Sequence, residues 1–278
     1  MHSATIESLP RSQALDYSLR TDIKTNAQPF FHSAADGSRT VLALLVHGFS
    51  GSPYDLSDLG RYLGEHNINA RGVLLAGHGG DYEHLAMTEH QDWWQSVYNE
   101  LEKLRDQYDN IILIGYSFGS NLVLDIASKH PEKVKGIICM STSVFIRKDR
   151  HVRFLAHFLS HFSDRAAKRR MAPEKRMVYE AGGRHITVPL KGLLSFFRFI
   201  DTVTKPNLHT VTSPLLLIHS RDDYASNPRS SEYIFDKIGS EDKELFIFNS
   251  FEHNPLNSSS RDVVFGKILS FFENHVAE

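Results

Sequence analysis

Six short apolar runs alternate along this chain with longer segments of helical spacing. The runs are rich in Val, Ile and Leu and continuously apolar, as expected for strands buried on both faces of a parallel sheet. They are Val41–Val46, Gly72–Leu75, Ile111–Ile114, Gly136–Met140, Leu215–His219 and Leu245–Phe248. The helical segments are Leu56–Leu63, Trp93–Tyr108, Leu122–Ser128, Glu232–Ile238 and Val263–Phe272. This order predicts an α/β fold, a mostly parallel sheet with helices on both faces. Phe30 and Phe31 predict an extra strand before it.

Residues 144–210 break this rhythm, because they separate two predicted strands by far more than one crossover helix requires. Apolar residues recur there at helical spacing in two stretches, Leu155–Phe162 and Leu193–Ile200. The sequence therefore predicts a helical cap at 144–210, inserted between two parts of a core formed by residues 1–143 and 211–278.

The predicted cap is basic, whereas the chain as a whole carries a formal net charge of −2. Between Arg147 and Arg198 there are 13 Lys and Arg against four acids, a net charge of +9. Two interpretations stay open. The cap helices pack their apolar stripes on the core, or they form a lid that transiently contacts a lipid or anionic interface, as basic amphipathic helices do.

The composition excludes several classes of protein. The chain has 278 residues, 41% of them hydrophobic, and its balanced charge argues against a nucleic-acid partner. A single cysteine, Cys139, rules out a disulfide framework. The apolar run Val41–Val46 is far shorter than the ~20 residues of a membrane span, and no signal-peptide pattern precedes it. We expect a soluble, cytoplasmic protein, and the oligomeric state is left open.

The motif Gly115-Tyr116-Ser117-Phe118-Gly119 directly follows one of the apolar runs and opens a helical segment. This is the setting of a nucleophile elbow, where a serine stands on a tight turn between strand and helix. The backbone is strained there, and a side chain at either glycine would collide with the adjacent strand or helix. Ser117 is therefore predicted to be a nucleophile; the alternative is a serine buried in an ordinary turn.

A serine hydroxyl needs a base to take its proton. In this architecture the partners follow in the order serine, acid, histidine, which leaves only His253 and His275. His275 lies in the last helical segment, whereas His253 follows the run Leu245–Phe248 in a loop. Because open α/β sheets place their chemistry in loops at strand carboxyl ends, His253 is the predicted general base.

Two neighbouring carboxylates, Asp222 and Asp223, follow the run Leu215–His219. Either could orient His253 and stabilise its protonated form. A shift of one residue reverses the side-chain direction, so the pattern alone does not choose between them. No carboxylate closely follows Gly136–Met140, which disfavours an acid there.

Acyl transfer also needs two N–H groups aimed at the developing oxyanion. The Phe118 amide, directly after the nucleophile, is one candidate. The other is expected in the loop after Val41–Val46, which reads His47-Gly48-Phe49-Ser50-Gly51, and we assign it to the Phe49 amide. His47 and His78 are expected to be structural hydrogen-bonding residues.

These motifs, with Gly77-His78-Gly79 and the late Asp and His, resemble the α/β-hydrolase superfamily. More narrowly, the chain resembles bacterial carboxylesterases and monoacylglycerol lipases, also in Gln28–Phe31 and Gln91–Gln95. In that group the catalytic acid stands four residues before an Asn-Pro pair, here Asn227-Pro228, so the resemblance selects Asp223. It also implies an oxyanion N–H directly after the His-Gly pair, at Phe49.

Two departures from that group concern the substrate and leave the reaction type unchanged. Tyr116 and Phe118 stand where the group often has leucines, and the cap is longer and more basic. Dehalogenases and epoxide hydrolases are disfavoured, because proteins of this fold with those activities carry an Asp where this chain has Ser117.

The sequence therefore predicts a serine carboxylic-ester hydrolase without cofactor or metal, with Ser117, His253 and Asp223 as its triad. Small-molecule esters, either short-to-medium acyl esters or monoacylglycerols, are the expected substrates. A thioesterase, amidase or acyltransferase would carry the same triad. A more distant alternative is a non-catalytic protein of this fold that binds a ligand.

Apolar cap residues are predicted to line an acyl pocket: Phe154, Leu155, Phe158, Phe196 and Phe197. His157 and His161 are spaced i, i+4 but have no third ligand at a spacing typical of metal sites, so a solvated helix face is expected. Cys139 lies within an apolar run and is expected to be a packing residue.

Overall fold

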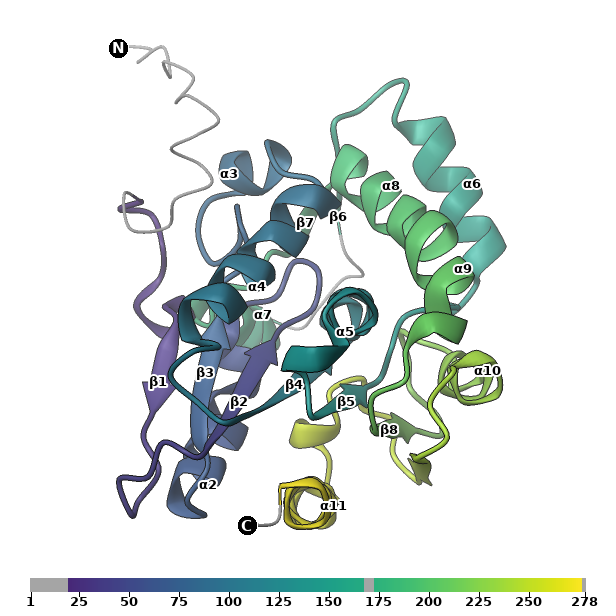
Figure 1. Cartoon of the computed structure of the whole chain (residues 1–278). Coiled ribbons are helices and arrows are strands. Elements are labelled where there is room, and N and C mark those ends of the chain that lie inside the picture. Colours follow the sequence, from purple (N-terminus) through teal and green to yellow (C-terminus); the bar gives the residue numbers. More distant parts are fainter. Residues whose placement is uncertain (1–19, 168–172, 277–278) are drawn as a thin grey trace.

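A seven-stranded sheet forms the centre of the molecule in the computed structural model, which describes residues 20–167 and 173–276 (Figure 1). The strand order is β1-β3-β2-β4-β5-β8-β9, and only the edge strand β1 runs antiparallel to its neighbour. The strands are β1 (Phe30–His32), β2 (Val41–Val46), β3 (Asn69–Val73), β4 (Asn110–Tyr116), β5 (Gly136–Met140), β8 (Leu215–Ser220) and β9 (Lys243–Phe248). The predicted mostly parallel sheet and the extra strand at Phe30 are confirmed.

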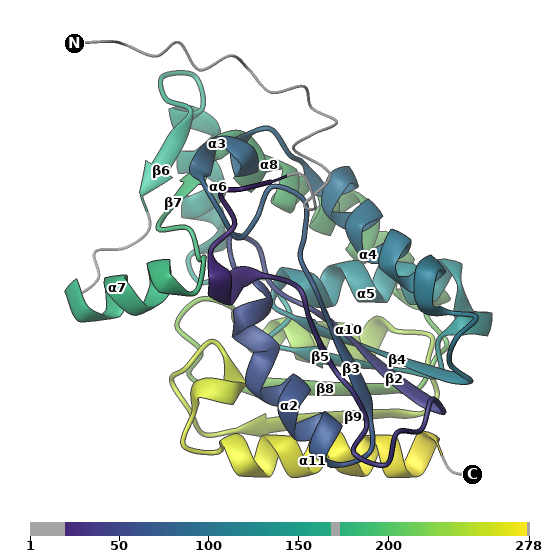
Figure 2. The same ribbon diagram turned by 90° about the vertical axis from the view of Figure 1, so that its left-hand side faces the viewer.

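Helices cover both faces of this sheet, because successive side chains of a strand point to opposite sides. In β2, Leu42 and Leu44 join one apolar core, while Ala43 and Leu45 join the other. Figure 2 shows α2 and α11 on one side of the sheet and α4 and α5 on the other. Among the described residues, the α-helices outside 144–210 are α2 (Ser57–Glu65), α3 (Tyr82–Ala86), α4 (His90–Leu104), α5 (Phe118–Lys129), α10 (Arg229–Lys237) and α11 (Arg261–His275). In the described ranges, none is both long and apolar enough to span a membrane.

Strand β3 begins earlier than the apolar run at Gly72–Leu75 predicts. Arg71 lies within it and interrupts the apolar pattern. The Arg71 Nε is 2.7 Å from Glu100 Oε1 of α4, so the charge inside this strand is paired. Leu74 and Leu75 are buried but lie beyond the end of the strand.

Residues 144–210 are not wholly helical, which corrects one expectation. Besides helices, the described part of this segment contains two three-residue strands that pair antiparallel, with Ala166 opposite Val188. Strands this short show no alternation that a sequence pattern can reveal. The elements are α6 (Asp149–Leu159), β6 (Arg165–Ala167), α7 (Pro173–Ala181), β7 (Thr187–Pro189), α8 (Leu190–Phe199) and α9 (Lys205–Asn207). Both views place α6 and α8 on the side of the sheet that also carries α4 and α5 (Figures 1 and 2).

Candidate active site

Ser117 stands where β4 meets α5, with a backbone φ of 54° and ψ of −118°. Such a conformation costs a residue with a Cβ on the order of 1–3 kcal/mol, so the surroundings must hold it. A Cβ at Gly115 would lie 2.4 Å from Ser120 Cα, and one at Gly119 would lie 2.2 Å from the Val46 carbonyl oxygen. Both glycines of the motif are therefore needed for the close approach of the turn to α5 and β2.

Loops at the carboxyl edge of the sheet bring Ser117, His253 and Asp223 together. Ser117 Oγ lies 3.0 Å from His253 Nε2, and His253 Nδ1 lies 2.7 Å from Asp223 Oδ2. Asp222 is exposed instead, and the described residues show no bond between its carboxylate and His253. Three side chains, of which Ser117 and His253 lie 136 positions apart in the sequence, thus form one continuous hydrogen-bonded chain.

Asp223 is completely buried and accepts several hydrogen bonds. Its Oδ1 accepts the backbone N–H groups of Ala225 and Ser226 at 2.7 and 3.0 Å. Burial alone would raise the pKa of Asp223. The electrostatic attraction of His253, with the hydrogen bonds from the His253 side chain and the Ala225 N–H and the nearby His219 ring, outweighs this and holds the pKa well below its usual value. The carboxylate is therefore ionised at neutral pH.

The ionised carboxylate determines where the protons lie. Asp223 can only accept, so in the neutral imidazole of His253 the Nδ1 atom carries the proton and Nε2 is left as an acceptor. The Ser117 hydroxyl therefore donates to Nε2. This is the resting arrangement of a serine that an adjacent histidine can deprotonate.

Two backbone N–H groups beside Ser117 have no acceptor among the described residues, those of Phe49 and Phe118. Phe118 is the first residue of α5, where the helix dipole favours negative charge. Gly48 brings the other loop close, since a Cβ there would lie 2.9 Å from Ser117 Cβ. Both N–H groups are available to a negatively charged oxygen bound next to Ser117.

Two further polar residues at this edge are absent from the sequence predictions. Ser143, in the loop after β5, has its Oγ 3.1 Å from Ser117 Oγ. His219 of β8 is completely buried, with Nε2 3.4 Å from Asp223 Oδ2 and Nδ1 2.7 Å from Ser231 Oγ. The position of Ser143 at the carboxyl end of a parallel strand is a usable signal, whereas His219 belongs to an otherwise apolar run and carries none.

A family model described as Hydrolase_4, serine aminopeptidase S33, matches residues 38–260, which is most of the chain. The chain belongs to this family. A carboxylesterase of Bacillus subtilis (strain 168) is 28% identical over 247 residues, which cover 88% of this chain and 96% of the relative. A thermostable monoacylglycerol lipase of Bacillus sp. (strain H-257) is 27% identical over 254 residues, covering 91% and 97%. This Hydrolase_4 protein is a serine hydrolase, similar to carboxylesterases and monoacylglycerol lipases.

Solved structures show the same fold. A structure from work on LipS and LipT, two metagenome-derived lipolytic enzymes, matches with a TM-score of 0.80 at 22% identity, covering 91% of this chain and all of the other. The monoacylglycerol lipase of Paleococcus ferrophilus matches with a TM-score of 0.74 at 16% identity, covering 89% and 98%. The α/β-hydrolase fold expected from the sequence is therefore confirmed.

Two of the five predicted acyl-pocket residues of this Hydrolase_4 enzyme lie in its interior. Phe196 and Phe197 of α8 are buried. The Phe196 ring lies 4.9 Å from the Phe118 ring and 5.9 Å from the Phe49 ring, measured between centroids. Phe196 therefore packs directly on the two residues whose N–H groups are available beside Ser117.

The other three predicted pocket residues lie on the outside of α6. Phe154, Leu155 and Phe158 are 73%, 52% and 52% exposed, so the prediction that they line an enclosed acyl pocket is wrong. The reason is the orientation of α6, because the side of this helix that packs on α8 carries Arg153. The Arg153 guanidinium lies 4.2 Å from the centre of the Phe197 ring, and the aromatic stripe faces outward.

Several histidines of the site region are structural. The His47 ring bonds to the Gly48 carbonyl through Nδ1 and accepts the Leu75 N–H at Nε2, and burial lowers its pKa to about 4. The His78 ring likewise accepts the Ser50 N–H. The structural roles expected for His47 and His78 are confirmed. Another serine–histidine contact, His90 Nδ1 to Ser195 Oγ at 2.7 Å, is buried and joins α4 to α8.

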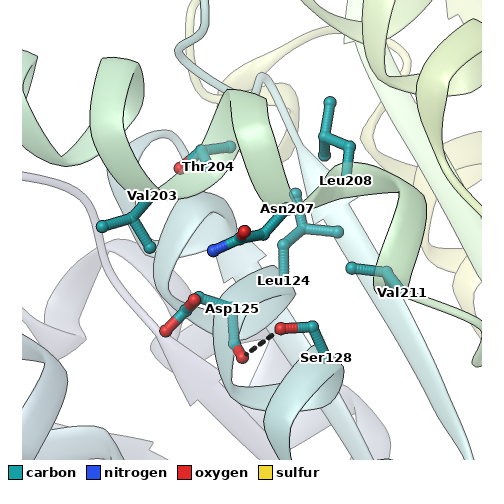
Figure 3. Close-up of a pocket in the computed structure, with 8 residues that line it drawn as sticks. All are labelled: Leu124, Asp125, Ser128, Val203, Thr204, Asn207, Leu208 and Val211. Carbon is teal, nitrogen blue, oxygen red and sulfur yellow. Dashed lines mark hydrogen bonds between the residues drawn. The ribbon is translucent and has the colours of Figure 1, made fainter.

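Other features lie apart from this edge. Burial raises the pKa of the Cys139 thiol in β5 to about 12, as suits a packing residue. In the described ranges, no group of three or more potential ligands is arranged to hold a metal ion. A small hollow between α5 and the segment after α8 contains no candidate catalytic residue (Figure 3). It is lined by Leu124, Asp125, Ser128, Val203, Thr204, Asn207, Leu208 and Val211.

Proposed function

We propose that this enzyme hydrolyses carboxylic esters, either short-to-medium acyl esters or monoacylglycerols, through an acyl-enzyme on Ser117. The observation that carries the proposal is the hydrogen-bonded chain from Ser117 through His253 to the buried, ionised Asp223. The relatives named carboxylesterase and monoacylglycerol lipase support the ester as substrate.

In the first half-reaction, Ser117 Oγ bonds to the ester carbonyl carbon while its proton passes to His253 Nε2. Asp223 stabilises the imidazolium that forms. The carbonyl oxygen becomes an oxyanion that accepts hydrogen bonds from the Phe49 and Phe118 N–H groups. The bond to the alcohol oxygen then breaks, and His253 gives its proton to the departing alcohol.

Water completes the cycle by the same route in reverse. It attacks the acyl carbon while His253 takes its proton, and the bond to Ser117 Oγ breaks as the proton returns to that oxygen. The acid product leaves and the resting state is restored. The step needs only the residues already present and a water molecule.

The aromatic surroundings of Ser117 support an apolar acyl group as the moiety recognised. Phe49 is only partly buried and packs on the rings of Phe196 and Trp93. Placing a hydrocarbon chain against such a surface removes apolar area from water, which favours binding by about 25 cal/mol per Å².

A panel of p-nitrophenyl esters from acetate to palmitate, with a monoacylglycerol, an acyl thioester and an acyl anilide, tests this proposal. We expect the highest kcat/KM on short-to-medium esters or on the monoacylglycerol, because the site offers an apolar aromatic surface to the acyl chain. The anilide is included because the family is described as a serine aminopeptidase. Preference for the anilide or the thioester would contradict the ester assignment but would leave the role of the triad unchanged.

We also propose that the outer face of α6 contacts lipid or another anionic interface. Phe154, Leu155, Phe158 and Phe162 are exposed there, and the rings of Phe158 and Phe162 lie 5.3 Å apart. Lys148 and Arg150 are exposed at the start of the same helix. Exposed apolar side chains beside basic ones are the pattern of helices that lie in the surface of anionic membranes.

Replacing both Phe154 and Phe158 by serine should weaken co-sedimentation with vesicles of anionic phospholipid while hydrolysis of a soluble short ester stays unchanged. Val263→Ser, which removes an exposed apolar residue on α11, is the matched control and should sediment like the parent. Equal sedimentation of all three proteins would contradict this role of α6.

A further inference from the structure

The hydroxyl group of Ser143 lies beside the nucleophile, although the mechanism above gives it no role. Its Oγ is 3.1 Å from Ser117 Oγ. Ser143 is 3% exposed, so water does not compete effectively for this contact. The contact joins the loop after β5 to the turn after β4, two neighbouring strands of the sheet.

The direction of this hydrogen bond follows from the protons of the triad. Ser117 has one hydroxyl proton, and it is donated to His253 Nε2 because Nδ1 already carries the histidine proton. Ser117 Oγ can therefore only accept from Ser143. The Ser143 hydroxyl is the donor, and it points its proton at the attacking oxygen.

The loop that carries Ser143 is held in place from two sides. Asn121 Nδ2 of α5 donates to the Ser143 carbonyl at 3.5 Å, and Ser226 Oγ donates to the Thr142 carbonyl at 2.7 Å. Ser226 also donates its N–H to Asp223 Oδ1. The same residue thus anchors both the Ser143 loop and the carboxylate that orients His253, which keeps the donor in position without reorganisation.

We propose that Ser143 is a further catalytic residue, whose hydroxyl donates to Ser117 Oγ and stabilises the negative charge that develops on that oxygen. This inference rests on the proposed function. During attack, Ser117 Oγ loses its proton to His253 while its bond to the acyl carbon forms. During hydrolysis of the acyl-enzyme, the same oxygen departs with the electron pair of the broken bond until His253 returns the proton.

Ser143 forms and breaks no covalent bond in either step, and its proton stays on its own oxygen. Its effect comes from the change in charge of its acceptor. Hydrogen bonds to charged oxygens are about twice as strong as those between neutral groups, so the donor stabilises both transition states more than the resting enzyme.

Ser143→Ala should lower kcat/KM for p-nitrophenyl butyrate by about 10- to 100-fold, the usual worth of a hydrogen bond to a charged group. We expect the loss mainly in kcat, with KM and the melting temperature little changed, because the resting contact is between neutral groups. The rate of labelling by a fluorophosphonate should fall by a similar factor, since that reagent also requires Ser117 Oγ to attack.

Two variants sharpen the test. Thr142→Val removes a buried hydroxyl on the same loop that forms no hydrogen bond with Ser117, His253 or Asp223 in the described ranges, so it should label and turn over like the parent. Ser143→Cys keeps a weak donor and should fall between the parent and Ser143→Ala. A melting curve for each variant separates loss of the donor from loss of the fold.

The possible outcomes separate failure of the Ser143 assignment from failure of the proposed ester hydrolysis at Ser117. If the parent is labelled at Ser117 and Ser143→Ala is labelled equally fast, the Ser143 assignment is wrong and the triad stands. A loss in Thr142→Val as large as that in Ser143→Ala would also overturn it, because the effect would then belong to the loop. If the parent itself is not labelled at Ser117, the proposed function fails, and the role of Ser143 fails with it.

Discussion

Ser117→Ala is expected to lower kcat by ~10⁴-fold or more, with the fold intact. Alanine removes the only oxygen that lies within hydrogen-bond distance of His253 Nε2 in the described structure. The neighbouring hydroxyl of Ser143 does not replace it, because its contact is to Ser117 and not to the base. Initial rates on a soluble p-nitrophenyl ester measure the effect.

Ser128→Ala is the matched control for that variant. Ser128 lies on the same helix α5, at the end away from the elbow, and among the described residues its hydroxyl bonds to the Asp125 carbonyl alone. It should retain the activity of the parent. Activity of Ser117→Ala close to that of the parent would mean that another residue carries the chemistry.

Asp223→Asn should lower kcat by about 10⁴-fold, because an amide in this position favours the wrong tautomer of the histidine. The buried carboxylate accepts the Nδ1 proton of His253 and the N–H groups of Ala225 and Ser226. An amide NH₂ in place of either oxygen would face donors, so the hydrogen bonds could not all be kept. The effect is measured as kcat on the same ester, with circular dichroism to check the fold.

The neighbouring Asp222 provides the internal control. Its side chain is exposed, and Asp222→Asn makes the same chemical change one residue away. We expect activity close to that of the parent. The reverse ranking of the two variants would move the catalytic acid to Asp222 and contradict the hydrogen-bond geometry.

The elbow and the sheet could be predicted from sequence because their signals are local. A strand buried on both faces must be apolar at nearly every position, as β5 is, and the strained turn at Ser117 demands glycines at fixed distances. The choice between Asp222 and Asp223 depended on resemblance instead. Which of two adjacent side chains faces His253 is determined by a loop that closes through hydrogen bonds to Asp223 itself.

The segment 144–210 shows why an apolar pattern alone does not predict which face of a helix is buried. The apolar stripe of α6 has the spacing of a buried helix face, yet Phe154 and Phe158 are exposed. The spacing of these residues indicates that one face of the helix is apolar, but it does not indicate what that face packs against. Ser143 escaped prediction because its partner, Ser117, lies 26 positions away in the sequence. His219 escaped it because it lies inside the otherwise apolar strand β8.

Fluorophosphonate labelling with identification of the modified residue, alongside ester hydrolysis by the same preparation, tests the central claim most directly. We predict that the label forms a bond to Ser117 Oγ and that ester turnover is lost in proportion to labelling. A label on a different serine, or full hydrolysis after Ser117 is blocked, would contradict the account and show that the hydrogen-bonded chain at this edge of the sheet is not the catalytic centre.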